Sequence, residues 1–303
     1  VLLPEMTPVI DKDWLAYRDL IAELNKKYFS LAWIASTVSS KNPHRSKVFT
    51  KIKKNELDPE LLPKIALHKR IKAHLIWGLD LVEATIEHYK IKRAFKDVNI
   101  PKKGLTVLFS FAFNKSFKSD GKFQDIYWGD LIPFLQKRTK VLLITQLLEN
   151  KPENLKKLAA QKDLLILPKE YFISPFDLLK AAFWQKFKAP KVKEKVIFQG
   201  KDIAPLINNE LERNKSENEF SSNYLYYLLA KKIAKKLKPE RFLYPLENHS
   251  FEKLMNFALQ KLSPSTKRIG FQHAAVIQKL YNYFPGPAEQ TLPIYPHKIV
   301  TVG

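Results

Sequence analysis

Residues 244–253 place chemically active side chains directly after an apolar run. The segment reads YPLENHSFEK and carries Glu247, Asn248 and Glu252 between an expected strand end and an expected helix start. Unpaired backbone N–H groups at the start of that helix would attract an anion such as a phosphate or a sugar carboxylate. The alternative is an ordinary helix start, with Asn248 or Ser250 as the cap and Glu252 in the first turn.

Residues 270–275, with the sequence GFQHAA, form a second segment of this kind. Gly270 lies inside an expected strand and permits close approach of another backbone or a ligand. Gln272 and His273 follow where that strand ends. Because histidine titrates near neutral pH, His273 is suited to act as a general base on a hydroxyl, with Glu247 orienting its ring. The alternative is a histidine that only bonds neighbouring backbone.

The elements that must position these residues read as an α/β fold with a parallel sheet flanked by helices. Short continuous apolar runs alternate with stretches of helical spacing, which is typical of a sheet covered on both faces. Strands are expected at residues 105–111, 141–147, 164–167, 196–198, 241–244, 268–271 and 298–302. Helices are expected at residues 128–137, 152–161, 175–186, 204–237 with a break near 214–218, and 251–262.

Such sheets bind ligands beyond the carboxyl ends of their strands, where both segments lie. We therefore expect the polar residues of the two segments to converge in one cleft. The predicted catalytic residues are His273 and Glu247, and the predicted substrate-binding residues are Asn248, Glu252 and Gln272.

Residues 1–100 are expected to form a mainly helical region ahead of residues 101–303. Apolar side chains recur at helical spacing from Trp14 to Tyr28 and again from residue 59 to about residue 95. Residues 31–35, LAWIA, are interpreted as a short buried strand, although spacing alone does not separate strand from helix. Asp11 and Asp13 form a D-x-D pattern, but they precede a helix and are interpreted as its cap.

Composition excludes several classes of protein. The chain has no cysteine, which excludes disulfides, thiolate metal sites and a cysteine nucleophile. The spacing of its eight glycines fits neither a P-loop nor a standard dinucleotide fingerprint. No apolar run reaches the about 18 residues that a membrane-spanning helix needs. Neither a metal nor a cofactor is predicted, because no HExxH arrangement or carboxylate at ligand spacing surrounds His44, His68, His74 or His88.

The two segments resemble the amino-terminal half of bacterial surface-polysaccharide glycosyltransferases of the GT-B type. The resemblance extends to LPIYPHKIVTVG at residues 292–303 and, upstream, to TVLFSFAF at 106–113 and FQDIYWGDLIPFLQK at 123–137. It implies two Rossmann-like domains that face a cleft, the first holding the acceptor and the second binding the nucleotide-sugar donor without a required metal. Glu247, Asn248, Glu252, Gln272 and His273 match the family's motif residues.

The resemblance also implies that residues 101–303 are the acceptor-side domain. The donor-binding domain would follow residues 298–303 and is not in the chain. The chain is then either a fragment of a longer enzyme or an acceptor-side module without its own donor site. We interpret it as a fragment, of an enzyme that transfers a sugar to a surface-polysaccharide or lipid-linked acceptor. On its own, the chain is not expected to transfer sugar.

The net charge of +22, from 52 basic and 30 acidic residues, has three interpretations. Lysine dominates, which favours diffuse attraction to anions over recognition of bases. Attachment to the anionic inner face of the cytoplasmic membrane, at about 1 kcal/mol per basic residue, suits a lipid-linked acceptor. The alternative function is a non-catalytic basic module that binds nucleic acid or membrane. Nucleic acid is not the expected partner, because the sequence has no RNP, KH or zinc-finger signature. The third interpretation is lysine on solvated helix faces.

Overall fold

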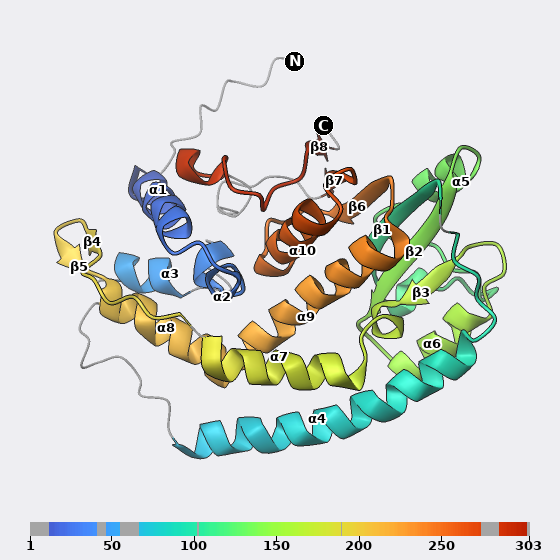
Figure 1. The fold of residues 1–303 in the computed structure, drawn as a ribbon, viewed down its shortest axis with the longest axis horizontal. Helices are drawn as coiled ribbons and strands as arrows, with labels where there is room; N and C mark the ends of the chain where they lie inside the picture. Colours follow the sequence, from blue (N-terminus) through green and yellow to red (C-terminus); the bar gives the residue numbers. More distant parts are fainter. Residues whose placement is uncertain are drawn as a thin grey trace.

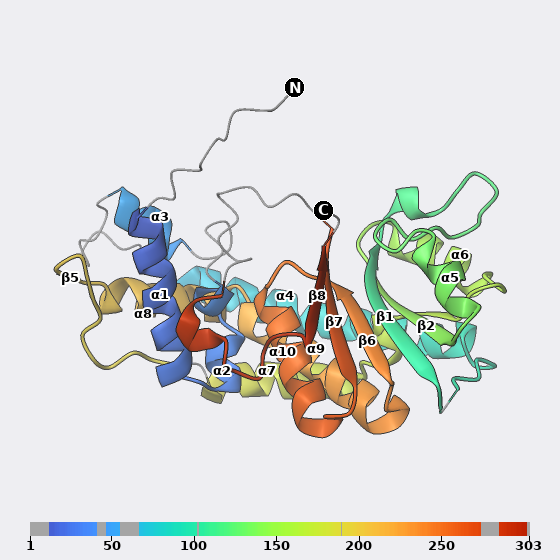
Figure 2. The ribbon, with the colours of Figure 1, turned by 90° about the horizontal axis from the view of Figure 1, so that it is seen from above.

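The computed structural model describes residues 12–40, 47–54, 67–101, 103–188, 190–273 and 285–301. Its centre is a six-stranded parallel sheet with the strand order β3-β2-β1-β6-β7-β8, flanked by helices (Figures 1 and 2). The strands are β1 (Leu105–Ala112), β2 (Lys140–Leu147), β3 (Ile166–Pro168), β6 (Arg241–Pro245), β7 (Lys267–Gln272) and β8 (Lys298–Thr301). The predicted α/β architecture is confirmed.

The strand order reverses direction at β1. From β1 the chain proceeds through β2 to β3 at one edge, then returns to β6 on the other side of β1 and continues through β7 to β8. The two central strands, β1 and β2, pair over their full length from Leu105 with Lys140 to Ala112 with Leu147. Both consist almost entirely of buried residues, as strands covered on both faces do.

Helices cover the sheet from opposite sides. α5 (Leu131–Gln136) and α6 (Lys151–Ala159) lie on one side, and α9 (Glu219–Lys232) and α10 (Ser250–Leu262) lie on the other (Figures 1 and 2). A π-helical turn, Ile233–Leu237, extends α9. The main apolar core joins Phe109 and Phe242 of the sheet to Leu229, Ala258 and other side chains of these helices.

A second apolar cluster joins the amino-terminal helices to later parts of the chain. It contains Tyr17 and Trp33 together with Ile207, Leu254 and Ile294. The elements around it are α1 (Lys12–Lys27), α2 (Leu31–Ile34), α3 (Val48–Lys53) and α8 (Ala204–Ser216). Helix α4 (Leu67–Ala94) runs along one margin of the molecule beside α7 (Pro175–Lys188) (Figure 1). The short 3-10 helices are η1 (Val38–Ser40), η3 (Asn114–Ser116), η4 (Lys169–Tyr171) and η7 (Pro287–Glu289).

One strand prediction is wrong, and another predicted strand lies outside the main sheet. Residues 31–34 form the helix α2, whose first turn is capped by the Ser30 hydroxyl accepting the N–H of Trp33 at 3.2 Å. Residues 197–198 form β4 (Ile197–Phe198), which pairs antiparallel with β5 (Lys201–Asp202) outside the main sheet. Gln199 and Gly200 both have positive φ, which is the backbone of a tight two-residue hairpin turn.

Some sequence predictions concern parts of the chain outside this description. Asp11 and His44 lie outside the described residues, as do the side chains of His68 and His74. Asp13 lies in the first turn of α1, where its carboxylate accepts the side-chain N–H of Gln199 at 2.7 Å. In the part of the chain that is described, no helix combines the length and the apolar character needed to cross a bilayer.

Candidate functional site

A pocket of about 380 Å³ opens at the carboxyl ends of three neighbouring strands. Phe111 of β1, Gln146 of β2 and Glu247, two residues after β6, contribute to its lining. The pocket therefore lies where the strand order reverses between β1 and β6. Open α/β sheets bind their ligands at this topological switch point.

Three helical segments complete the pocket. The first turns of α9, the amino terminus of α10 and the turn that contains η1 supply mainly hydroxyl, amide and aromatic groups. Their lining residues are Glu219, Ser222, Asn223 and Tyr226, then His249, Ser250, Phe251 and Glu252, and finally Thr37 and Ser40.

The carboxylate of Glu247 lies between two imidazole rings. Its Oε2 is 2.7 Å from Nε2 of His249, and its Oε1 is 3.6 Å from Nε2 of His273. The side chain of Glu247 is 41% exposed, against 13% for His249 and 20% for His273. Tyr127, which lines the pocket, places its ring edge-to-face with that of His273 at 4.5 Å. Glu247 is therefore the member of this trio most open to a ligand.

The other ring nitrogens of the two histidines are buried. Nδ1 of His249 and Nδ1 of His273 have no hydrogen-bond partner among the described residues. His273 is not among the described residues that line the pocket. The structure thus brings Glu247 and His273 together, as the sequence predicts, and places both imidazoles beside the Glu247 carboxylate.

Glu252 holds the loop that carries Glu247. Glu252 is 1% exposed, and its carboxyl group accepts the backbone N–H of Glu247 at 3.1 Å and that of Asn248 at 2.8 Å. The N–H groups of residues 247–249 are therefore occupied by a side chain of the protein itself, whereas the expected anion site at the first N–H groups of α10 stays a prediction. Glu252 lies in the first turn of α10, as the alternative interpretation predicts, but the N-cap residue is His249 and not Asn248 or Ser250.

Burial is the main influence on the carboxyl group of Glu252. It raises the pKa of Glu252 well above its ordinary value, and the charge of Glu247 acts in the same direction. The backbone N–H groups of residues 247–249 oppose this rise, because they favour the ionised form.

Asn248 and Gln272 do not reach the pocket lining. Asn248 is buried and adopts a left-handed backbone conformation with φ of 56°. Gln272 ends β7, where it is half-buried and aligned with Thr301 of β8. Among the predicted substrate-binding residues, only Glu252 contributes to the lining.

Gly270 permits a close approach, but the approaching groups belong to the protein itself. A Cβ atom at this position would lie 3.1 Å from side-chain atoms of Leu246 and 3.3 Å from Pro296. Leu246 directly precedes Glu247, so the glycine lets the loop of the site pack against β7.

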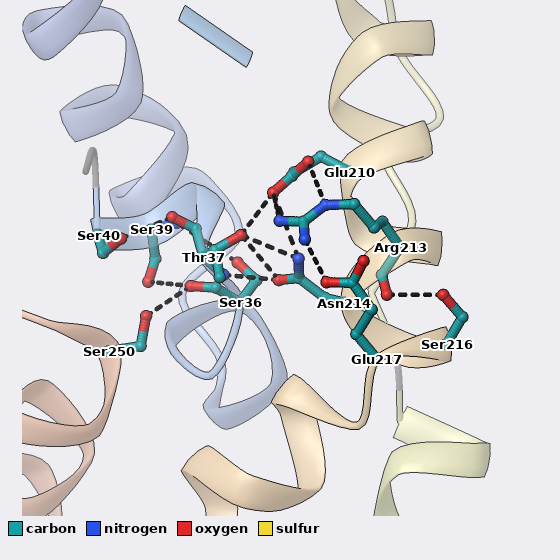
Figure 3. A network of polar contacts seen from close by, with 10 residues as sticks. All are labelled: Ser36, Thr37, Ser39, Ser40, Glu210, Arg213, Asn214, Ser216, Glu217 and Ser250. Atoms are coloured by element: carbon teal, nitrogen blue, oxygen red, sulfur yellow. Dashed lines mark hydrogen bonds and ion pairs between the residues drawn. The ribbon is translucent and has the colours of Figure 1, made fainter. Parts of the chain in front are cut away.

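Buried hydrogen bonds fix the turn that forms one wall of the pocket (Figure 3). The backbone N–H of Thr37 donates to Asn214 at 2.7 Å, and its hydroxyl donates to Glu210 at 2.7 Å. The hydroxyl of Ser250 donates to the carbonyl of Ser36 at 2.7 Å. Because these bonds link the turn to both α8 and α10, the wall is held in place before any ligand binds.

The pocket is acidic although the protein is strongly basic. Its lining includes the carboxylates of Glu219 and Glu247, and none of the described lining residues is Lys or Arg. Aromatic rings form another part of the wall, with Phe111 and Phe251 edge-to-face at 6.1 Å and Phe251 beside Tyr226 at 4.8 Å. Such a lining suits a ligand with many hydrogen-bond donors and some apolar surface. Among the described residues, no three His, Asp or Glu side chains are placed so that they could hold a metal ion together.

Sequence reasoning missed several residues of the site. His249 lies two residues after Glu247 in the same segment, and this closeness in sequence indicates that it could belong to the site. Thr37, Ser222 and Asn223 carried no such signal, because only the packing of distant helices brings them to the pocket.

Comparison with protein-family models, with curated proteins and with solved structures finds no significant match to this chain.

Proposed function

We propose that the pocket binds the sugar acceptor of a GT-B-like glycosyltransferase, and that this chain is the acceptor side of the enzyme. The observation that carries the proposal is the exposed Glu247 carboxylate, which lies between two imidazoles at the switch point of a parallel sheet. A carboxylate backed by imidazoles is suited to accept a proton from a sugar hydroxyl. The hydroxyl, amide and aromatic groups around it suit a polyhydroxylated ligand.

In the proposed reaction, the acceptor hydroxyl donates a hydrogen bond to Glu247. As the hydroxyl oxygen forms a bond to the anomeric carbon of a nucleotide sugar, Glu247 takes the proton. The bond between the anomeric carbon and the phosphate oxygen breaks, and the nucleoside diphosphate leaves with its electron pair. His249 and His273, whose Nε2 atoms face the two carboxylate oxygens, would orient the carboxylate.

This assignment exchanges two of the roles inferred from the sequence. His273 was expected to be the base and Glu247 to orient it. Because Nε2 of His273 faces Glu247 and its Nδ1 is buried, the geometry favours Glu247 as the base and the histidines as positioning residues. Glu252 then acts through the loop backbone rather than on the substrate.

The acidic lining also favours a sugar acceptor over a nucleotide-sugar donor as the ligand of the pocket. A nucleotide sugar carries two phosphates, and a pocket with Glu219 and Glu247 but no described Lys or Arg in its lining would repel them. The donor would therefore meet the acceptor at the mouth of the pocket, with its phosphates held by groups outside the pocket lining. A surface-polysaccharide or lipid-linked glycan remains the proposed acceptor class.

Saturation-transfer NMR with a panel of methyl glycosides and sugar phosphates tests the proposal. We expect neutral methyl glycosides to bind and sugar phosphates to bind less well. Glu247→Ala should weaken binding roughly tenfold or more, because a hydrogen bond to a charged group contributes about 1.5–3 kcal/mol. Glu240→Ala is the matched control, since Glu240 is an exposed carboxylate at the opposite end of the same strand.

Two results would contradict the acceptor function. One is a folded protein that binds no sugar of the panel. The other is equal weakening by Glu247→Ala and Glu240→Ala. If the protein instead bound RNA with an affinity that falls steeply with salt, the alternative of a non-catalytic basic module would replace this proposal.

A further inference from the structure

Helix α4 carries an apolar stripe that points away from the protein. Val82, Ile86 and Tyr89 are spaced four and three residues apart, so they share one face of the helix. The buried Ile91 and Phe95 lie on the opposite side, against the main core. The stripe is therefore not part of the packing that holds α4 to the molecule.

Helix α7 carries a second stripe of the same kind. Phe176, Leu179 and Phe183 share one face, and the buried Asp177 and Ala181 face the protein. α7 contacts α4, and the two helices lie next to each other in Figure 1. We call the six side chains on these two stripes the α4–α7 face.

The α4–α7 face is unusual for the surface of a helix. Its six side chains are between 46% and 72% exposed, and they are half of the large apolar residues that are exposed in the described part of the chain. Helices normally present polar residues to water, so exposed apolar stripes on two helices that contact each other are typical of an interaction site.

Basic residues border this face. On α4, Lys90 and Arg93 follow the stripe by one turn, and on α7 Lys180 lies between Leu179 and Phe183. Lys231, near the end of α9, has its pKa lowered by burial and by the nearby charge of Lys180. Glu83 is exposed on α4, whereas Asp177 of α7 is buried in an ion pair with Lys232. Lys90, Arg93 and Lys180 thus outnumber Glu83 and the half-buried Glu87, so the border of the face carries a net positive charge.

We propose that the α4–α7 face docks on an anionic lipid bilayer. Tyr89, Phe176 and Phe183 would enter the headgroup region, while the neighbouring lysines contact lipid phosphates with their stems lying along the apolar surface. A second copy of the chain is a poorer occupant, because it would bring another +22 charge and another basic border against this one. A nucleic-acid backbone offers no apolar counterpart to the two stripes.

Vesicle flotation tests this proposal with the double variant Phe176→Ser/Phe183→Ser. We expect the protein to float with phosphatidylcholine vesicles that contain phosphatidylglycerol and to stay in solution with phosphatidylcholine alone. The double variant should lose about tenfold or more of its vesicle affinity, because two aromatic anchors are removed. Ile197→Ser is the matched control, since Ile197 is 56% exposed on the β4–β5 hairpin, away from the face.

Three results would overturn the proposal. The first is that the wild-type protein does not float with the anionic vesicles. The second is that the double variant floats as well as the wild type, and the third is that Ile197→Ser reduces flotation as much as the double variant does. A dimer that the double variant dissociates, without vesicle binding, would assign the face to a second copy instead. Sugar binding by the double variant reports separately on the pocket and should be unchanged.

Discussion

The carboxyl group of Glu252 lies beneath the loop of the site and accepts the N–H groups of Glu247 and Asn248. Its burial raises its pKa above the ordinary value of 4.5, so the folded protein retains a proton that the unfolded chain releases. The stability that this proton contributes is complete below pH 4.5 and is lost as the pH rises through the folded pKa.

We therefore predict that Glu252→Gln changes the pH dependence of stability. The free energy of unfolding of the wild type, relative to that of the variant, should fall as the pH rises from 4.5 toward neutrality. Urea unfolding followed by tryptophan fluorescence at several pH values measures this difference. Glu240→Gln controls for the loss of an exposed carboxylate. A difference that grows with pH would show that the three N–H donors outweigh burial at Glu252.

At this scale the sequence predicted only part of the site. Glu247 and His273 follow adjacent parallel strands, and that arrangement brings their side chains together wherever the sheet forms. The turn at Thr37 reaches the same pocket through hydrogen bonds to Asn214, which is 177 residues away. Residue type and local spacing hold no information about such a contact.

The elements of the sheet were the easiest to predict, because β1 and β2 are long and continuously apolar. Short apolar runs were harder. Residues 31–34 are too few to show a helical period, and a single Ser30 cap decides that they form a helix. At residues 197–202 the decisive feature is the positive φ at both Gln199 and Gly200, which turns the chain back into a hairpin.

The packing of η7 on α1 gives a prediction at the element scale. A Cβ atom at Gly286 would lie only 2.4 Å from that of Ala22, so Gly286→Ala should push η7 away from α1. We expect a loss of about 1–3 kcal/mol in the free energy of unfolding.

Gly78→Ala is the matched substitution for this test. Gly78 lies inside α4 and has no atom within 4 Å of the added Cβ, so alanine should stabilise the helix by about 0.5–1 kcal/mol. Chemical denaturation of both variants checks the opposite signs. Equal effects would contradict the close packing of η7 on α1.

For the molecule as a whole, the charge of +22 opposes the compact state through self-repulsion. We predict that added sodium chloride raises the midpoint of thermal unfolding, by about 2–4 °C for each kcal/mol of repulsion that is screened. Differential scanning calorimetry over a series of salt concentrations measures this shift. A falling midpoint would mean that ion pairs such as Lys232 with Asp177 contribute more than the repulsion removes.

The contact between Asn25 and Glu289 also limits how early the amino-terminal helices can complete their packing during synthesis. The side-chain amide of Asn25 donates to a carboxylate 264 residues later in the chain. A ribosome that adds about 5–20 residues per second needs roughly 13–53 seconds to cover that distance. Throughout that time, the apolar faces of α1 and α2 lack their contacts with Ile294 and its neighbours, which have not yet been synthesised. Part of the apolar surface of the nascent α1 and α2 therefore stays uncovered while the chain between Asn25 and Glu289 is made.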